Sequence, residues 1–347
     1  MLRSKWPLSL LLLGIVMTIY PPHAGAQELV PPPGGLPIWD STNQVLFFGY
    51  GVETSGTLVR GYVDGHQRGA DIDIFKIFPG AQAVIVESVT AGPGGTTFIA
   101  TILNFGGRYI RRAILTYDSS GQLLKTWDPA PQYAAAIAYS QEDDAILILG
   151  DRDVPQGPNA PYYPLVVEYS REGKVLKSMV AANTLKDRDN WFGQGGEIGQ
   201  PTLKVTKDRI YFYAPTNREV VTCDRNGVVL AYRSISDIVE KFVTQDAYRL
   251  VQIHQVDFSD DGNIVLELLL SNNRGYAIEV VRINIKTGEA VSVHKAFNGT
   301  GLSFIGVKDN QYLYIDYGRS LSLYVQLDQA LEPVPLTTAF EGRSRVH

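Results

Sequence analysis

The sequence has 347 residues and a net charge of −5, from 31 Lys and Arg against 36 Asp and Glu. This modest acidic excess disfavours binding to nucleic acids, whose phosphates attract basic patches. Cys223 is the single cysteine of the sequence. A disulfide within the chain is therefore excluded, and a hydrophobic core must hold the fold.

The N-terminal residues have the pattern of a secretory signal peptide. The basic residues Arg3 and Lys5 precede an apolar run from Leu8 to Tyr20, and a site of small residues ending at Ala26 follows. We predict a signal peptide over residues 1–26, cleaved near Ala26, and a secreted or periplasmic mature chain. The apolar run is shorter than the roughly 20 residues that span a bilayer. An uncleaved anchor is the weaker alternative, and we expect no membrane span after cleavage.

A Pro- and Gly-rich leader is predicted over residues 27–37, followed by one domain over residues 38–340 and a tail over residues 341–347. Within the domain, short runs of apolar, β-branched and aromatic residues end in turn residues, which is typical of strands. The clearest predicted strands are Gln44–Tyr50, Thr96–Ile102, Ala145–Gly150, Arg209–Ala214, Asn263–Leu270 and Gln311–Tyr317.

A polar loop with a glycine recurs along the chain. It reads YDSSGQLLKTW from Tyr117, YSREGKVLKSM from Tyr169, CDRNGVVLAYR from Cys223 and, more loosely, INIKTGEAVSVH from Ile283. The glycine supplies the positive φ that a tight hairpin needs, and the Asp, Ser or Asn before it can bond its own backbone. With a looser copy near each end of the domain, the loop marks six units of about 40 to 60 residues. Each unit can be divided into four strands.

Units of this length with four antiparallel strands are typical of propeller blades, because a lone sheet cannot bury both of its faces. The pattern ESVTAGPGGTTFIA, from Glu87 to Ala100, followed by RAILTYDSSGQLLKTW, resembles the blades of six-bladed β-propellers of the NHL and TolB-like kind, which are common in exported bacterial proteins. The resemblance covers nearly all of the mature chain and implies an all-β fold of six four-stranded antiparallel blades. It implies no activity. Five or seven blades, a sandwich and an extended solenoid are the alternatives.

Two further features have structural interpretations. Apolar residues recur at helical spacing over Ser236–Tyr248, after a serine that can cap a helix, so we predict a short helix between two blades there. Cys223 lies on a predicted strand directly before a turn, and no histidine nearby can activate its thiol. We predict a buried packing residue rather than a nucleophile.

Catalytic motifs are absent from the sequence. The chain contains neither the H-E-x-x-H pattern of zinc hydrolases nor the G-x-S-x-G pattern of serine hydrolases. The GPGG run at 92–95 precedes two threonines instead of the Lys-Ser/Thr pair of a phosphate loop. It is interpreted as a turn.

Two side chains are candidates for a metal site at the central channel. Glu87 and His254 lie near the starts of predicted innermost strands, where side chains can face the axis. A carboxylate or an imidazole there can bind a metal or act as a base. Salt-bridged or packing roles are the alternatives. The corresponding starts in other units are Tyr133, Gln200 and Leu302, a set with few metal-ligand types, which favours binding over metal-dependent catalysis.

The longest predicted connection, Asn183–Pro201, carries Trp191 and Phe192. Aromatic side chains on a long loop can stack on a sugar or hold a peptide. The alternatives are that both aromatics pack over a blade junction, or that the oxygen-bearing side chains between 187 and 190 bind calcium.

A second, proline-rich connection, Asp151–Pro164, carries Tyr162 and Tyr163. Together the two connections predict an exported, non-catalytic β-propeller that binds a protein, peptide or glycan partner, or a small ligand, through loops on one face and without a cofactor. The alternative is a metal-dependent hydrolase or lyase with its site at the central channel and one divalent ion, for which calcium is a candidate. The sequence does not decide whether the two loops share one face.

Overall fold

The computed structural model describes residues 36–49, 58–63, 66–107, 110–130, 132–150, 164–180, 184–185, 200–245, 248–273, 275–297, 302–316, 322–327 and 330–333. The predicted signal peptide and the predicted tail lie outside these residues. Their assignments therefore stay predictions.

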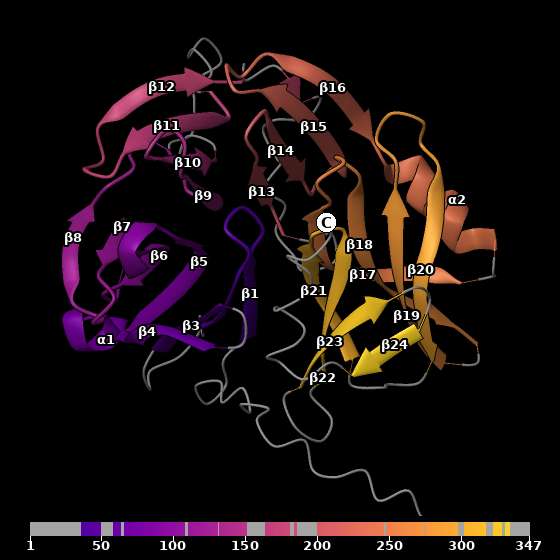
Figure 1. Ribbon diagram of the computed structural model, residues 1–347, viewed down its shortest axis with the longest axis horizontal. Coiled ribbons are helices and arrows are strands. Elements are labelled where there is room, and N and C mark those ends of the chain that lie inside the picture. The colour runs from indigo at the N-terminus through magenta and orange to yellow at the C-terminus, as the bar shows by residue number, and fades with distance from the viewer. Residues whose placement is uncertain are drawn as a thin grey trace, which may run out of the picture.

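The described strands form four-stranded antiparallel sheets, each built from consecutive strands (Figure 1). The first sheet contains β1 (Leu36–Asp40), β2 (Val45–Gly49), β3 (Leu58–Val63) and β4 (His66–Asp73). The second sheet contains β5 (Ala83–Ala91), β6 (Thr97–Asn104), β7 (Ile110–Tyr117) and β8 (Leu123–Trp127). The third sheet contains β9 (Ala136–Ser140), β10 (Ala145–Leu149), β11 (Val166–Ser170) and β12 (Val175–Met179).

Three more sheets follow in the same manner. The fourth sheet contains β13 (Thr202–Val205), β14 (Arg209–Ala214), β15 (Glu219–Asp224) and β16 (Val229–Ser234). The fifth sheet contains β17 (Arg249–Phe258), β18 (Ile264–Asn272), β19 (Gly275–Ile283) and β20 (Ala290–Phe297). The sixth sheet contains β21 (Leu302–Lys308), β22 (Gln311–Asp316), β23 (Ser322–Leu327) and β24 (Ala330–Pro333). The all-β prediction is confirmed as six four-stranded antiparallel sheets within the described residues.

The recurring glycine lies in the turn between the third and fourth strands of its sheet, and its predicted positive φ is confirmed. The φ angle is 77° at Gly121, 79° at Gly173, 81° at Gly227 and 79° at Gly288. In the second sheet, Oδ1 of Asp118 accepts hydrogen bonds from the backbone N–H groups two and four residues later, at 2.9 and 3.0 Å. The turn sequence therefore sets the turn geometry locally.

The core lies between neighbouring sheets, as β14 shows. Ile210 and Phe212 pack with the third sheet, whereas Tyr211 and Tyr213 pack with the fifth. Because successive side chains of a strand point to opposite faces, a strand enclosed by two sheets is apolar at nearly every position. Cys223 is fully buried in the first of these clusters, and burial raises the pKa of its thiol to about 12. The predicted packing role of this cysteine is confirmed.

The first strands of successive sheets contact one another along the chain. β1 contacts β5, β5 contacts β9, β9 contacts β13, β13 contacts β17 and β17 contacts β21, which in turn contacts β1. Figure 1 shows the sheets following one another around a common centre, from indigo to yellow. The first strands therefore surround the centre of the molecule.

The predicted helix is present as α2 (Ser236–Gln245), which contacts β17. It ends before the predicted boundary at Tyr248, and the hydroxyl of Ser236 donates to the carbonyl of Asn217 at 3.0 Å. The single turns α1 (Ile74–Ile77) and η1 (Pro93–Gly95) were outside the prediction. They are too short to produce a helical period in the sequence.

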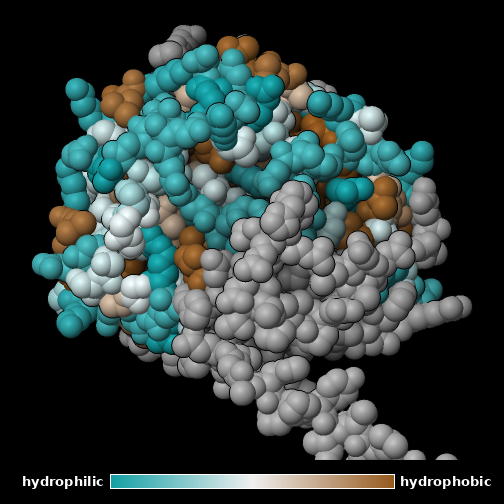
Figure 2. Space-filling model, in the orientation of Figure 1, coloured by the Kyte–Doolittle hydropathy of each residue, from teal (hydrophilic) through white to brown (hydrophobic). Residues whose placement is uncertain are grey.

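The outermost strands carry exposed apolar side chains. Leu124 on β8, Val175 and Leu176 on β12, and Val229 and Leu230 on β16 are each more than a third exposed. Figure 2 shows a mostly hydrophilic face with brown hydrophobic areas towards its periphery. Within the part of the chain that the structure describes, no helix is both long and apolar enough to cross a membrane.

Candidate binding cavity

A cavity of about 590 Å³ lies among the first strands of five sheets. Residues of β1, β5, β9, β13 and β17 line it, so the cavity occupies the centre that the strand contacts define. Much of its wall is aliphatic, with Ile85, Ile137 and Leu203 among the lining residues. The cavity exists because the first strands surround the centre without their side chains filling it.

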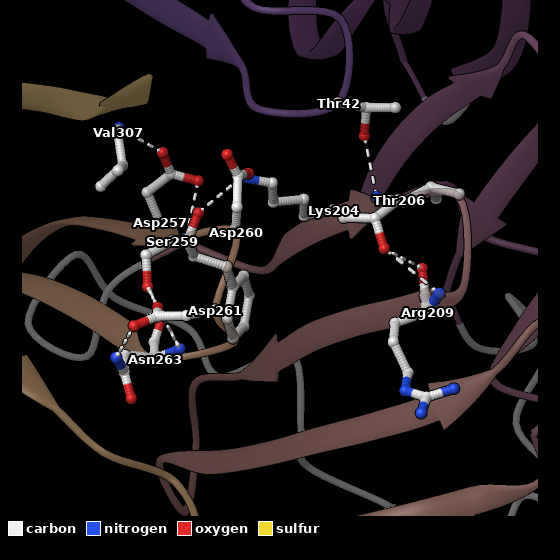
Figure 3. A network of polar contacts seen from close by, with 12 residues as sticks. Thr42, Lys204, Thr206, Arg209, Asp257, Ser259, Asp260, Asp261, Asn263 and Val307 are labelled. Atoms are coloured by element: carbon white, nitrogen blue, oxygen red, sulfur yellow. Dashed lines mark hydrogen bonds and ion pairs between the residues drawn. The ribbon is translucent and has the colours of Figure 1, made fainter. Parts of the chain in front are cut away.

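The turn between β1 and β2 starts in the wall of this cavity, which Asp40 and Ser41 line. Oδ2 of the buried Asp40 accepts hydrogen bonds from the backbone N–H of Ala91 at 2.7 Å and from Oγ1 of Thr90 at 2.9 Å, both in the second sheet. Nδ2 of Asn43 donates to a backbone carbonyl of the third sheet at 3.2 Å. The hydroxyl of Thr42 accepts from the backbone N–H of β13 at 3.0 Å, in the fourth sheet (Figure 3). One short turn thus joins four sheets.

Asp257 on β17 is a second buried carboxylate in the cavity wall, and only 1% of its surface is exposed. Its oxygens accept hydrogen bonds from the backbone N–H of Val307 at 2.6 Å and of Phe258 at 2.7 Å. Burial raises the pKa of Asp257, and the positive charge of Lys204 lowers it in part. Both donors are backbone N–H groups, so the carboxylate of Asp257 has a structural role.

Lys204 on β13 is almost fully buried beside Asp257. Its Nζ donates to the carbonyl of Phe258 at 2.7 Å and to Oδ1 of Asp260 at 2.8 Å (Figure 3). Burying an ammonium is costly unless it is both paired and hydrogen-bonded. The bonds cross from the fourth sheet to the fifth, as the bonds of Asp40 and Asp257 also cross between neighbouring sheets. Polar side chains of the first strands therefore connect the sheets around the cavity.

Glu87 lies in the cavity wall at a β-bulge, because the register between β5 and β6 shifts between Val86 and Ser88. A bulge leaves its extra residue unpaired and re-aims the side chain. Burial raises the pKa of the half-buried Glu87, opposed by a hydrogen bond from the hydroxyl of Tyr133 and by the charge of Arg112. The carboxylate is therefore held from one side while it borders the cavity.

Arg112 and Tyr133 lie behind Glu87, away from the central cavity. The guanidinium carbon of Arg112 is 4.4 Å from the ring centroid of Tyr133, a cation–π arrangement. With Glu87, both residues line a second cavity of about 10 Å³, which is at the lower limit of the space that holds one water molecule. Neither residue lines the larger cavity.

His254, the other predicted metal ligand, also lies at a bulge, between Ile253 and Gln255 of β17. It does not line the central cavity. Its Nδ1 is 3.7 Å from Oε2 of the buried Glu267. Glu267 in turn accepts hydrogen bonds from the backbone N–H of Phe304 at 2.8 Å and from Oγ of Ser303 at 3.0 Å. His254 therefore borders the boundary between the fifth and sixth sheets.

The two predicted metal ligands are on different sheets. Among the residues that the structure describes, no group of three or more His, Cys, Asp or Glu side chains is arranged to hold a metal ion. The predicted metal-binding role of Glu87 and His254 thus stays a prediction. Of the other strand starts considered, Gln200 lines the cavity and Tyr133 supports Glu87.

The predicted aromatic binding residues Trp191, Phe192, Tyr162 and Tyr163 lie outside the described residues. The strands next to their loops are described. Leu149, at the end of β10, pairs with Ala136, the cavity-lining start of β9. Gln200, just before β13, lines the cavity as well. The described chain before the first loop thus ends beside the start of β9, and the chain after the second loop resumes at the start of β13.

The sequence reasoning missed Arg112, Asp40, Asp257 and Lys204. Their only sequence signal is a charged residue within an otherwise apolar strand. For Asp257 this is the run QVDF, in which the carboxylate follows a residue that points to the core. Such a signal indicates burial with a partner, but does not identify that partner.

Comparisons with known proteins give similarity of structure alone. No family model matches the chain, and no curated protein matches it. A candidate 6-phosphogluconolactonase from Bacteroides uniformis is 10% identical with a TM-score of 0.38, over 81% of this chain and 93% of that one. Sqt1 from Saccharomyces cerevisiae is 8% identical with a TM-score of 0.39, over 85% and 71%. A candidate exported protein from Bacteroides fragilis is 12% identical with a TM-score of 0.42, over 84% and 81%. At these values none of their functions is transferred to this chain.

Proposed function

We propose that this chain is an exported six-bladed β-propeller that binds a small ligand in its central cavity and does not catalyse a reaction. The six sheets are its blades. The contacts of each first strand with the next, and of β21 with β1, support a closed arrangement. In a propeller each blade buries its faces against its two neighbours, which fits a core located between sheets.

The central cavity carries the proposal. Its volume of about 590 Å³ lies within the range of about 300–1,000 Å³ that is usual for small-molecule sites. Its wall combines aliphatic side chains with polar groups, among them Glu87, Gln200 and Gln255. This combination also is usual for such sites, where apolar area contributes affinity and polar groups orient the ligand.

The predicted loop residues extend this proposal. Trp191, Phe192, Tyr162 and Tyr163 would form a rim beside the cavity, since one loop follows β10 beside the cavity-lining Ala136 and the other ends at the cavity-lining Gln200. A protein, peptide or glycan would contact that rim. Export to the periplasm or the medium would follow from cleavage of the signal peptide predicted over residues 1–26.

Ligand-observed NMR with a fragment library tests the proposal. We expect that some fragments bind the mature wild-type protein and that the same fragments bind Gln200→Trp weakly or not at all. The reason is that Gln200 is exposed and lines the cavity, so an indole at this position occupies the cavity. Gln122→Trp is the matched control, since Gln122 is exposed on the turn of the second sheet, and it should bind the fragments as the wild type does. Fragments that bind Gln200→Trp as strongly as the wild type would contradict the proposal.

A hydrolase or lyase is the second candidate, because one observation favours it. Burial raises the pKa of Glu87 in the wall of a cavity, and such carboxyl groups often serve as general bases. In this alternative Glu87 takes a proton from a substrate in the cavity. Turnover of a lactone or ester that Glu87→Gln abolishes would support it, and loss of that turnover on chelation would add the predicted divalent ion.

A further inference from the structure

The charge of the cavity wall restricts the ligand. Within the described residues the charged side chains that line the cavity are Asp40, Glu87 and Asp257, all of them carboxylates. An anionic ligand would have to approach these groups in a partly enclosed space, where like charges repel more strongly than in water. The wall therefore disfavours phosphorylated or carboxylated ligands.

Two of the three carboxylates are already satisfied by the protein. Asp40 is 4% exposed and accepts bonds from backbone N–H groups in its own turn and in β5. Asp257 is 1% exposed and accepts bonds from β17 and β21. Neither can turn towards a ligand without leaving buried N–H groups unpaired, which is costly.

Glu87 is the carboxylate that remains accessible. It is only half-buried, and its bulge frees it from the regular pairing of β5 with β6. Tyr133 donates to it, and Arg112 neutralises it in part from behind, through the small second cavity. This arrangement orients the carboxylate while no cation of the described residues lies between it and the central cavity.

Two other residues of the cavity wall, on the fifth and fourth sheets, use their donors within the protein. Nε2 of Gln255 donates to the carbonyl of Ile305 at 3.3 Å, so its side-chain oxygen is the free end of the amide. The hydroxyl of Thr202 has one proton, for which the backbone carbonyls of Gln200, at 3.2 Å, and Val256, at 3.3 Å, are the acceptors. A ligand that supplies hydrogen-bond donors complements such a wall.

We propose that the central cavity binds a primary or secondary amine, as its ammonium form, with the nitrogen at Glu87 and an apolar body against the aliphatic wall. The inference rests on the proposed ligand-binding function and specifies its ligand class. A charge-assisted hydrogen bond to Glu87 supplies the selectivity, and the aliphatic side chains supply contact area.

Three probes with one apolar body test this inference: cyclohexylmethylamine, cyclohexylmethanol and cyclohexanecarboxylate. Their dissociation constants are measured by NMR titration of the mature protein near pH 8 in sodium phosphate, because an amine buffer would compete. We expect the amine to bind about tenfold more tightly than the alcohol, the usual effect of one charge-assisted hydrogen bond. The carboxylate should bind more weakly than the alcohol.

Glu87→Gln separates charge from shape, since the amide keeps the size of the side chain. It should bring the amine to within about twofold of the alcohol and leave the alcohol unchanged, because only the charge-assisted part is lost. Glu289→Gln, at an exposed glutamate of the fifth sheet, is the control and should keep the preference for the amine. A circular dichroism melt of each variant confirms that it is folded.

The outcomes separate the two proposals. If the alcohol or the carboxylate binds as tightly as the amine, and Gln200→Trp weakens all three, the cavity binds ligands but the inference about amines is wrong. An amine preference that persists in Glu87→Gln also overturns the inference, as does failure of the amine to bind at millimolar concentration. If Gln200→Trp weakens neither these probes nor any library fragment, the proposed function fails as well.

Discussion

Asp257 and Glu87 line the same cavity, but the protein uses them differently. Asp257 is 1% exposed and bonds two backbone N–H groups, one of them in the next sheet. Glu87 is half-buried at a bulge and bonds the side chain of Tyr133. Burial raises the pKa of both carboxyl groups. A raised pKa in a cavity thus does not distinguish a structural carboxylate from an available one, whereas the identity of its partners does.

Asp257→Ala should give the largest effect. The change leaves the N–H groups of Phe258 and Val307 unpaired in the core and removes the charge beside Lys204. We expect a loss of about 3–5 kcal/mol in the free energy of unfolding, measured by urea denaturation. Asp257→Asn keeps one acceptor and should lose less. A loss below about 1 kcal/mol for the alanine variant would show that Asp257 is not structural.

Lys204→Met should follow, with a loss of about 2 kcal/mol, because the carbonyl of Phe258 loses its donor in a buried site. The variant also removes the positive charge that lowers the pKa of Asp257. A carboxyl group whose pKa is raised by folding stabilises the protein less as the pH rises through that pKa. The loss should therefore be larger at pH 8 than at pH 5. Equal losses at the two pH values would contradict the charge interaction of Lys204 with Asp257.

Glu87→Gln should change stability less than either, by under about 1 kcal/mol near neutral pH, since no backbone group depends on its carboxylate. Its sign depends on pH. Burial raises the pKa of Glu87, so the wild type loses stability relative to the variant as the pH rises through that pKa. Tyr133 and Arg112 are the titratable groups that act on this carboxylate, and Asp128 acts on Arg112. Urea denaturation of both proteins between pH 4 and pH 8 measures the difference, and a constant difference would oppose a raised pKa.

His254→Gln should have the smallest effect, within about 0.5 kcal/mol. Its side chain is 33% exposed, and 3.7 Å from Glu267 is a long contact for an ion pair. Because His254 does not line the cavity, the amine preference proposed for Glu87 should be unchanged. Loss of ligand binding in this variant would instead favour the sequence prediction that both residues belong to one site.

The fold was largely predictable from the sequence because its signals are local. The hairpin glycines need a positive φ, and the residues before them bond their own backbone, so the turns at Gly121 and Gly227 could be located without knowing any tertiary contact. The strands between the turns alternate their faces and are apolar on both. These two signals were enough to predict four-stranded units.

The site was only partly predictable because it depends on contacts between sheets. The position of Glu87 in its strand predicted that this residue lies near the channel. The same argument predicted that position for His254, but in the structure the side chain of His254 lies beside Glu267. Arg112 lies on β7 and Tyr133 in the connection before β9, so they meet only because the second and third sheets pack together. The loops with Trp191 and Tyr162 lie outside the described residues, so their binding role stays a prediction.

Every described sheet consists of consecutive strands, so among the described residues no sheet joins the first strands of the fold to the last by backbone hydrogen bonds. The two ends of the described fold meet instead through β1 and β21, where the indole of Trp39 packs so closely over Gly306 that a methyl group at this glycine would collide with it. Side-chain packing contributes to this contact. Under mechanical load or heating, we expect the molecule to open first at this contact. The lifetime of the native state would then depend strongly on the packing of Trp39 over Gly306.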